Sequence, residues 1–237
     1  AAAGIERGDA LLKVDAISVV TNNTQLGVNA FARAAFEPEA GSSHKFEFLR
    51  RGGSSTAEVR LTAGQVAMDA VPWVDVLKVG SRNVGYLLFN DHSALAEAQL
   101  FHAVGYLSDA RVDELVLDLR YNGGGFLDIA SELAYMIAGP AATAGRAFER
   151  LQFNSKYATH HPLTGTPLEP LPFHATTRNF SMAAGTPLPT LNLGRVYVLT
   201  SPLTCSASES LINGLRGIGI QVVQVGGDTR GKPYGFY

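Results

Sequence analysis

The segment TCSASE (residues 204–209) decides the fold, because it stands where a strand gives way to a helix. Before it comes the short apolar run VYVLT (196–200), whose β-branched and aromatic residues predict a buried strand. After it, apolar residues recur at helical spacing from Leu211 to Ile218. Ser206 is therefore expected at a helix N-terminus, where unpaired N–H groups and the helix dipole favour negative charge. A hydroxyl there could attack a carbonyl while N–H groups hold the oxyanion, although S-x-x-E is also the spacing of an ordinary capping box.

A second strand, IQVVQV (220–225), leads into the glycine-rich turn GGDTRGK (226–232), which carries one lysine. A serine nucleophile needs a base to take its proton, and a neutral lysine amine can serve. At the ordinary lysine pKa of about 10.4, only about one amine in a thousand is neutral near physiological pH, and burial in an apolar pocket lowers such a pKa. We therefore expect the glycines to let the backbone turn Lys232 inward, into a pocket that excludes water.

The run ELVLDLR (114–120) is nearly continuously apolar, which is typical of a strand buried on both faces of a parallel sheet. The turn YNGGG (121–125) and a helix predicted over 126–138 follow it. A phosphate-binding loop has the same order of elements, but the turn lacks both G-K-[ST] and G-x-G-x-x-G, which argues against nucleotide binding. Asp118 and Arg120 are expected to form a structural ion pair. Three strand–helix pairs predict an α/β domain with a largely parallel sheet.

Three stretches of the chain resemble the C-terminal processing peptidase (tail-specific protease) family of Ser/Lys serine peptidases. LDLRYNGGG (117–125) is similar to that family's DLR-x-N-x-GG, CSASE (205–209) to its SASASE segment, and GGDTRGK (226–232) to its G-x-x-T-x-GK. The order of the three stretches and their strand–helix context make the match more specific than any one of them. The resemblance covers roughly residues 75–237.

The resemblance implies a ClpP/crotonase-like α/β fold and a serine endopeptidase that cleaves polypeptides near C-termini or in unfolded segments. It implies that Ser206 is the nucleophile and forms an acyl-enzyme, and that Lys232 is the general base. The oxyanion hole would consist of backbone N–H groups of Ala207 and of Gly124 or Gly125. The resemblance implies no cofactor, and it implies a location in the cell envelope or periplasm, or outside the cell.

The chain departs from the family pattern near the lysine. Family members often carry a polar residue that steadies the lysine, eleven residues after the serine or four after the lysine, and these positions hold Gly217 and Phe236 here. The serine-to-lysine spacing is also one residue longer than the pattern. The orienting partner of Lys232 is thus unassigned, which leaves open a catalytically silent peptide-binding or scaffold protein on the same fold. A third interpretation is a crotonase-type enzyme whose glycines hold a thioester oxyanion.

The first part of the chain resembles the second part of a PDZ domain. Within GIERGDALLKVD (4–15), the run ALLKV (10–14) predicts a strand; NNT (22–24) opens a helical stretch, and HKFEFLR (44–50) with AEVRL (57–61) predicts a hairpin. PDZ domains capture peptide ends by adding a strand to a sheet edge, and the segment that would hold a terminal carboxylate lies before Gly4. A small α+β domain without a peptide function is the alternative.

These patterns give a PDZ-like domain over 1–64, a connector over 65–80 and a peptidase domain over 81–237. The chain opens with AAA and runs straight into the first domain, which predicts a fragment, and the peptidase domain is expected to continue beyond the last residue. Residues 140–194 are rich in proline and are expected to border the substrate groove.

Two further chemistries, metal binding and cysteine catalysis, find little support in the sequence. His160, His161 and His174 fall in the proline-rich segment, but without H-E-x-x-H or paired cysteines they do not form a zinc motif. Cys205 beside Ser206 suggests a cysteine peptidase, yet that chemistry needs a nearby histidine, and no motif supplies one. We therefore expect no metal and an inert thiol.

Composition narrows the class of protein. The 237 residues are 46% hydrophobic and 17% charged, which describes a foldable globular chain rather than a disordered one. A net charge of −2 gives no reason to expect a nucleic acid or an anionic membrane as partner. A single cysteine excludes an intrachain disulfide, and no apolar run is long enough to span a bilayer. The expected partner is a polypeptide substrate, and the sequence does not indicate an oligomeric state.

Overall fold

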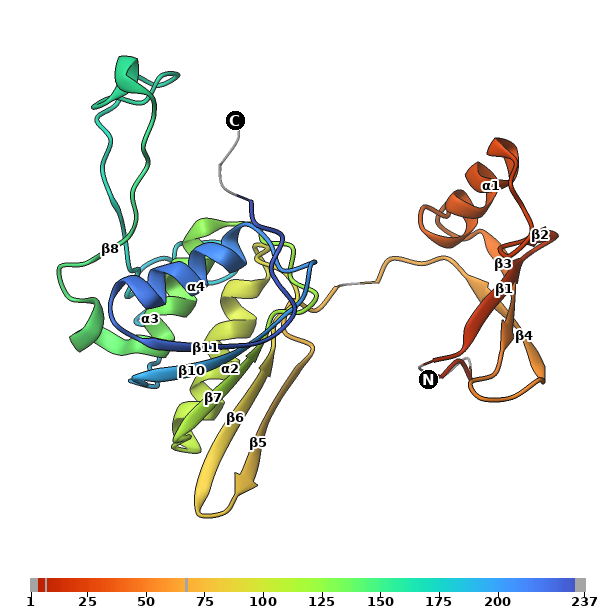
Figure 1. The fold of residues 1–237 in the computed structure, drawn as a ribbon, viewed down its shortest axis with the longest axis horizontal. Helices are drawn as coiled ribbons and strands as arrows, with labels where there is room; N and C mark the ends of the chain where they lie inside the picture. Colours follow the sequence, from red (N-terminus) through yellow and green to blue (C-terminus); the bar gives the residue numbers. More distant parts are fainter. Residues whose placement is uncertain (1–3, 7, 67, 233–237) are drawn as a thin grey trace. The chain divides into compact units, whose positions relative to one another are not determined.

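The computed structural model describes residues 4–6, 8–66 and 68–232, and two compact units, Ala1–Met68 and Asp69–Tyr237, divide the chain (Figure 1). The smaller unit is a four-stranded antiparallel sheet, in the order β2-β1-β3-β4, with one helix. Its elements are β1 (Ala10–Val14), β2 (Ile17–Ser18), α1 (Gln25–Ala35), β3 (Ser43–Leu49) and β4 (Thr56–Thr62). The strand, helix and hairpin expected here are confirmed, and Thr24 caps α1 by accepting a hydrogen bond from the Gly27 N–H.

The larger unit is built on a five-stranded sheet in the order β11-β10-β7-β6-β5. The four strands from β11 to β6 run parallel, and β5 pairs antiparallel with β6 at one edge, so the prediction of a largely parallel sheet is confirmed. The strands of this sheet are β5 (Trp73–Val79), β6 (Arg82–Leu88), β7 (Glu114–Asp118), β10 (Arg195–Thr200) and β11 (Gln221–Gly226). The other elements are α2 (Ala96–Asp109), α3 (Leu127–Thr143), β8 (Ala147–Glu149), the 3-10 turn η1 (Ser155–Tyr157), β9 (Leu171–Pro172) and α4 (Ala207–Gly217).

The strand β5 was not expected, because the sequence interpretation placed residues 65–80 in a connector. Residues 73–79 instead pair along their whole length with β6 across a tight turn at Gly80. The unit boundary falls between Met68 and Asp69. The alternation of WVDVLKV (73–79) was a strand signal, and the larger unit therefore begins earlier than residue 81.

The core lies between one face of the sheet and the helices. Leu87, Leu117 and Val198 are paired neighbours on β6, β7 and β10, and all three are fully buried. They join a cluster that includes residues of α2, α3 and α4, and α3 packs against both of the other helices (Figure 1). None of the described helices is long and apolar enough to cross a membrane.

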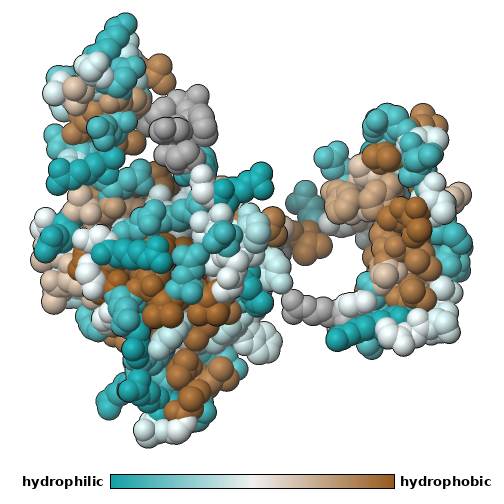
Figure 2. Space-filling model, viewed as in Figure 1, coloured by the Kyte–Doolittle hydropathy of each residue, from teal (hydrophilic) through white to brown (hydrophobic). Residues whose placement is uncertain are grey.

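The predicted burial on both faces is confirmed for β7, in which four of five residues are buried, but the other face of the sheet is more open at β10. In β10, buried and half-exposed residues alternate, so this strand is not buried on both faces. Figure 2 shows hydrophobic residues gathered over β10 and β11 and again over β5, where Leu77, Val79 and Val225 are exposed. The helices described here cover the core face, and the alternation follows from that one-sided packing.

The proline-rich segment is held to the helices through a buried carboxylate. Glu97 of α2 is fully buried and accepts hydrogen bonds from the backbone N–H groups of Arg178, Phe180, Ser181 and Met182. Between β8 and β9 the same segment projects away from the sheet and the helices (Figure 1). Part of it is thus firmly anchored, although it has few regular elements.

A second buried carboxyl, that of Glu132 on α3, lies close to Glu97. When protonated, Glu132 donates a hydrogen bond to the Glu97 carboxylate. Burial, with a further contribution from the charges of Glu97 and Asp128, raises the pKa of Glu132 to about 8, so the folded chain keeps a proton there at neutral pH.

This proton predicts a pH-dependent stability. The unfolded chain releases it near pH 4.5 and the folded chain near pH 8, so Glu132 lowers the free energy of unfolding as pH rises between these values, by up to about 1.4 kcal/mol per pH unit. Glu132→Gln should flatten this slope, which denaturant unfolding at several pH values between 5 and 8 would measure. Equal slopes in the wild type and in the variant would contradict the assignment, and Glu169→Gln, which removes an exposed carboxylate, is the control.

Candidate active site

Ser206 lies between β10 and α4 as the N-cap residue of the helix, where the sequence placed it. Its backbone has φ 59° and ψ −118°, a conformation that residues with side chains rarely adopt and that costs about 1–3 kcal/mol. Such strain persists only where the surroundings fix it, and it concentrates at functional sites. The turn thus holds the hydroxyl in one defined orientation at the start of the helix.

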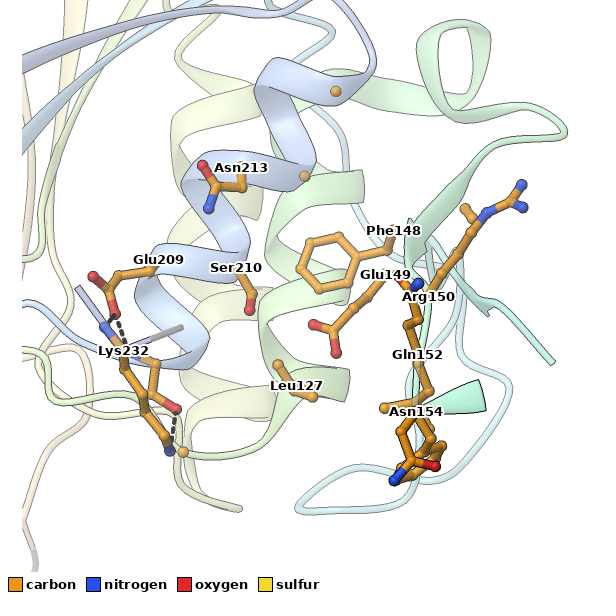
Figure 3. A pocket seen from close by; sticks show the side chains of 17 residues that line it. Leu127, Phe148, Glu149, Arg150, Gln152, Asn154, Glu209, Ser210, Asn213 and Lys232 are labelled. Atoms are coloured by element: carbon orange, nitrogen blue, oxygen red, sulfur yellow. Dashed lines mark hydrogen bonds between the residues drawn. The ribbon is translucent and has the colours of Figure 1, made fainter. Parts of the chain in front are cut away.

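Lys232 reaches this hydroxyl from the turn that follows β11. Its Nζ lies 3.3 Å from Ser206 Oγ and donates a hydrogen bond to it (Figure 3). The structure therefore brings together the two residues that the sequence singled out. The expectation of a buried amine was wrong, however: Lys232 is exposed, because the cavity beside Ser206 is open to solvent.

Glu209, one turn into α4, links the two segments. Its carboxylate accepts hydrogen bonds from the backbone N–H groups of Ser206 (2.8 Å), Gly231 (2.6 Å) and Lys232 (3.1 Å), and from Thr229 Oγ1 (2.7 Å). Partial burial alone would raise the pKa of Glu209, but these hydrogen bonds bring it below the ordinary value, so the group is ionised at neutral pH. The sequence showed this residue only as part of a capping box.

The glycine turn after β7 lies directly against the serine. A Cβ on Gly124 would stand 2.7 Å from Ser206 Cβ, so only glycine fits there. The Gly124 N–H already donates to Asn122 Oδ1 at 2.9 Å. The N–H groups of Gly125 and Ala207 have no acceptor among the described residues, and Gly125 lines the same cavity as Ser206. Of the three donors implied by the sequence, these two are available to an oxyanion.

Asn122 organises this turn, a role that the sequence did not assign to it. It is fully buried, and its side-chain amide donates to the Phe89 carbonyl oxygen at 3.0 Å. Its Oδ1 also lies 2.9 Å from Nδ1 of His92, a buried histidine whose pKa burial lowers to about 4. His92 is therefore neutral at physiological pH and supports the turn from beneath.

A cavity of about 1030 Å³ adjoins the serine and the lysine. One side is formed by α4, from Ser206 through Ser210 to Asn213, and the other by β8 with the residues that follow it up to Asn154 (Figure 3). This wall belongs to the proline-rich segment, so residues 147–154 line a cavity beside Ser206, and that this cavity is the substrate groove stays a prediction.

The remaining candidate residues make contacts that support the fold. The expected Asp118–Arg120 pair is confirmed, with Arg120 Nη2 at 2.6 Å from Asp118 Oδ2. His174 is buried and bonds through Nε2 to Asp128 Oδ1 at 2.7 Å. Within the described ranges, no histidine hydrogen-bonds to the Cys205 thiol, and no group of three side chains could hold a metal ion.

At the two positions where the family pattern has a polar residue that steadies the lysine, this chain has Gly217 and Phe236. Gly217 ends α4 and lines the cavity without a side chain, and Phe236 lies outside the described residues. The backbone hydrogen bonds of Gly231 and Lys232 to Glu209 instead fix the position of the turn.

Comparison with known proteins relates this chain to a family. A family model described as Peptidase family S41 matches residues 83–235. A carboxyl-terminal-processing protease of Picosynechococcus sp. is 30% identical over 185 residues, 78% of this chain and 43% of that protein. One from Synechocystis sp. is 28% identical over 133 residues, 56% of this chain and 30% of the relative. The chain thus spans less than half the length of these curated relatives.

Solved structures agree on the fold. A crystal structure described as an S41 protease from Bacteroides fragilis NCTC 9343 superposes with a TM-score of 0.67 at 25% identity, covering 97% of this chain and 56% of that one. The photosystem II D1 C-terminal processing protease superposes with a TM-score of 0.52 at 21% identity, covering 98% of this chain and 54% of that one. The second likeness concerns the fold alone.

Proposed function

This chain belongs to peptidase family S41, and on that premise we propose that it is a serine endopeptidase in which Ser206 and Lys232 form the catalytic dyad. The observation that carries the proposal is the 3.3 Å approach of Lys232 Nζ to Ser206 Oγ, from two turns 26 residues apart. The shared support of both turns by Glu209 adds to it.

In the proposed mechanism, neutral Lys232 takes the Ser206 hydroxyl proton while Oγ bonds to the scissile carbonyl carbon. The carbonyl oxygen becomes an oxyanion, which the N–H groups of Ala207 and Gly125 stabilise; one such donor is typically worth about 3 kcal/mol. The C–N bond then breaks as Lys232 returns the proton to the leaving amine. Water, deprotonated by the same amine, hydrolyses the resulting acyl-enzyme and regenerates the serine.

Because Lys232 is exposed, the proposed reaction would begin only once substrate covers the amine. A peptide lying in the cavity would exclude solvent from this exposed amine, and exclusion of water favours the neutral form that the reaction needs. The proposal therefore couples activation of the base to substrate binding.

The wider proposals rest on the family. We propose a ClpP/crotonase-like peptidase domain over 81–237, extended at its start by β5, a connector from 65 and a PDZ-like peptide-binding unit over 1–64. Substrates would be polypeptides cleaved near their C-termini or in unfolded segments, and the site of action the cell envelope, the periplasm or the cell exterior. Membership of S41 supports the peptidase domain and its polypeptide substrates, and the strands and helix of the first unit are the support for the PDZ-like proposal.

The nucleophile can be identified directly by covalent labelling. A fluorophosphonate should modify Ser206 and no other described serine, as peptide mass spectrometry after proteolysis would show. Ser206→Ala should abolish the adduct, whereas Ser155→Ala, at an exposed serine of η1, and Cys205→Ser should keep it. A folded chain that remains unlabelled would favour the alternative, a silent peptide-binding protein on this fold, and loss of labelling in Cys205→Ser would favour a thiol nucleophile.

A further inference from the structure

The cavity beside Ser206 has one polar side and one apolar side. Ser210 and Asn213 follow Ser206 at helical spacing and present polar groups along α4. Facing them are Leu127 at the start of α3 and Phe148 of β8. Phe148 is fixed from behind, because its ring packs against Phe173 at 5.4 Å and against the bare backbone of Gly214. The cavity thus has a defined wall, with room for a side chain in front of it.

A carboxylate points into this space. Glu149, the last residue of β8, is half-buried and directs its carboxylate into the cavity between Leu127 and Ser210 (Figure 3). Among the described residues it has neither a hydrogen-bond partner nor an ion-pair partner. Glu149 therefore contributes a negative charge that no neighbouring side chain within the described ranges neutralises.

The other charged groups that line the cavity do not offset it. Glu209 is occupied by four donors from the serine and lysine turns. Lys232 directs its amine to Ser206 Oγ, and the Arg150 side chain points away from Glu149 (Figure 3). The Glu149 carboxylate therefore has no countercharge among the described residues that line the cavity. A cationic group of a bound molecule would supply one.

We propose, resting on the peptidase function above, that Glu149 makes this cavity a subsite for a lysine or arginine side chain of the substrate, close to the cleaved bond. Such a side chain has an apolar stem and a charged head. The stem would pack along Leu127 and Phe148, and the head would form a charge-assisted hydrogen bond with Glu149. An acidic side chain in the same place would be repelled. The carboxylate therefore favours basic substrate side chains and disfavours acidic ones.

The subsite can be tested with peptides that differ in one side chain. Matched peptides carry lysine, norleucine or glutamate at successive positions around the cleaved bond, and kcat/KM is measured for each with the full chain. At one position the wild type should prefer lysine over norleucine by at least about tenfold. Glu149→Gln should reduce this ratio to near one, and Glu149→Lys should reverse the order in favour of glutamate. Glu169→Gln, which removes an exposed carboxylate outside the cavity, should leave the ratio unchanged.

Binding separates this proposal from the peptidase proposal. Fluorescence anisotropy with the same peptides and the Ser206→Ala chain reports the preference without turnover. If no peptide is cleaved but lysine peptides bind more tightly in a Glu149-dependent way, the peptidase proposal fails and the subsite stands. Equal rates for lysine and norleucine peptides at every position, the same ratio in Glu149→Gln, or no binding of any peptide would overturn the subsite.

Discussion

Replacing Lys232 with methionine should lower kcat/KM for peptide hydrolysis by at least about 1,000-fold, with Ser206 still in place. General-base catalysis typically contributes about 10²–10⁴-fold, and the amine of Lys232 is also the donor that lies 3.3 Å from the serine oxygen. Methionine has a similar length and no proton to exchange. Peptide hydrolysis and the rate of fluorophosphonate labelling should therefore fall together, while the thermal unfolding midpoint changes little, because the side chain is exposed.

Two further lysine variants sharpen this result. Lys232→Arg keeps the positive charge but not the function, because a guanidinium cannot lose its proton in a protein, so it should be as inactive as Lys232→Met. Lys78→Met removes an exposed lysine from β5 and should leave kcat/KM unchanged. A Lys232→Met chain that kept more than a tenth of its activity would show that another group, or water alone, takes the serine proton.

The sequence predicted most of what short segments determine. Ser206 was placed correctly at a strand–helix junction, because an apolar strand and helical spacing are local patterns. The structure has the predicted strand as β10 and the predicted helix as α4. Lys232 was found from a glycine turn after a strand. The alternation of polar and apolar residues in β5 also indicates a strand, but the sequence interpretation assigned this segment to a connector.

What the sequence could not supply depends on contacts between distant segments. Asn122 supports the glycine turn by bonding to two groups in the segment that follows β6, the Phe89 carbonyl oxygen and the His92 ring. The open cavity beside Lys232 forms between α4 and β8, which are far apart in the sequence, so no local pattern encodes it. Glu209 was assigned to the cap of its own helix, although half of its partners lie more than twenty residues further on.

Glu209→Gln should lower kcat/KM by about 100-fold, roughly 2.7 kcal/mol of transition-state stabilisation, without unfolding the chain. The four groups that bond to Glu209 all donate, and a carboxylate accepts from all of them. A glutamine has one acceptor oxygen and an NH2 group that must face donors. One of the two turns would then lose its support, either the Ser206 turn or the Lys232 turn, and the 3.3 Å contact between them would lengthen.

A double-mutant cycle separates this positioning role from a loss of stability. If Glu209 acts by holding Lys232 against Ser206, then Glu209→Gln should cost little in a chain that already carries Lys232→Met, because the contact it protects is gone. If it merely stabilises the fold, the two losses should multiply. Thr229→Ala, which removes one of the four donors and neither turn's backbone, should give a smaller loss than Glu209→Gln. Multiplicative losses in the cycle, together with a lowered unfolding midpoint for Glu209→Gln, would assign the residue to stability rather than to the geometry of the dyad.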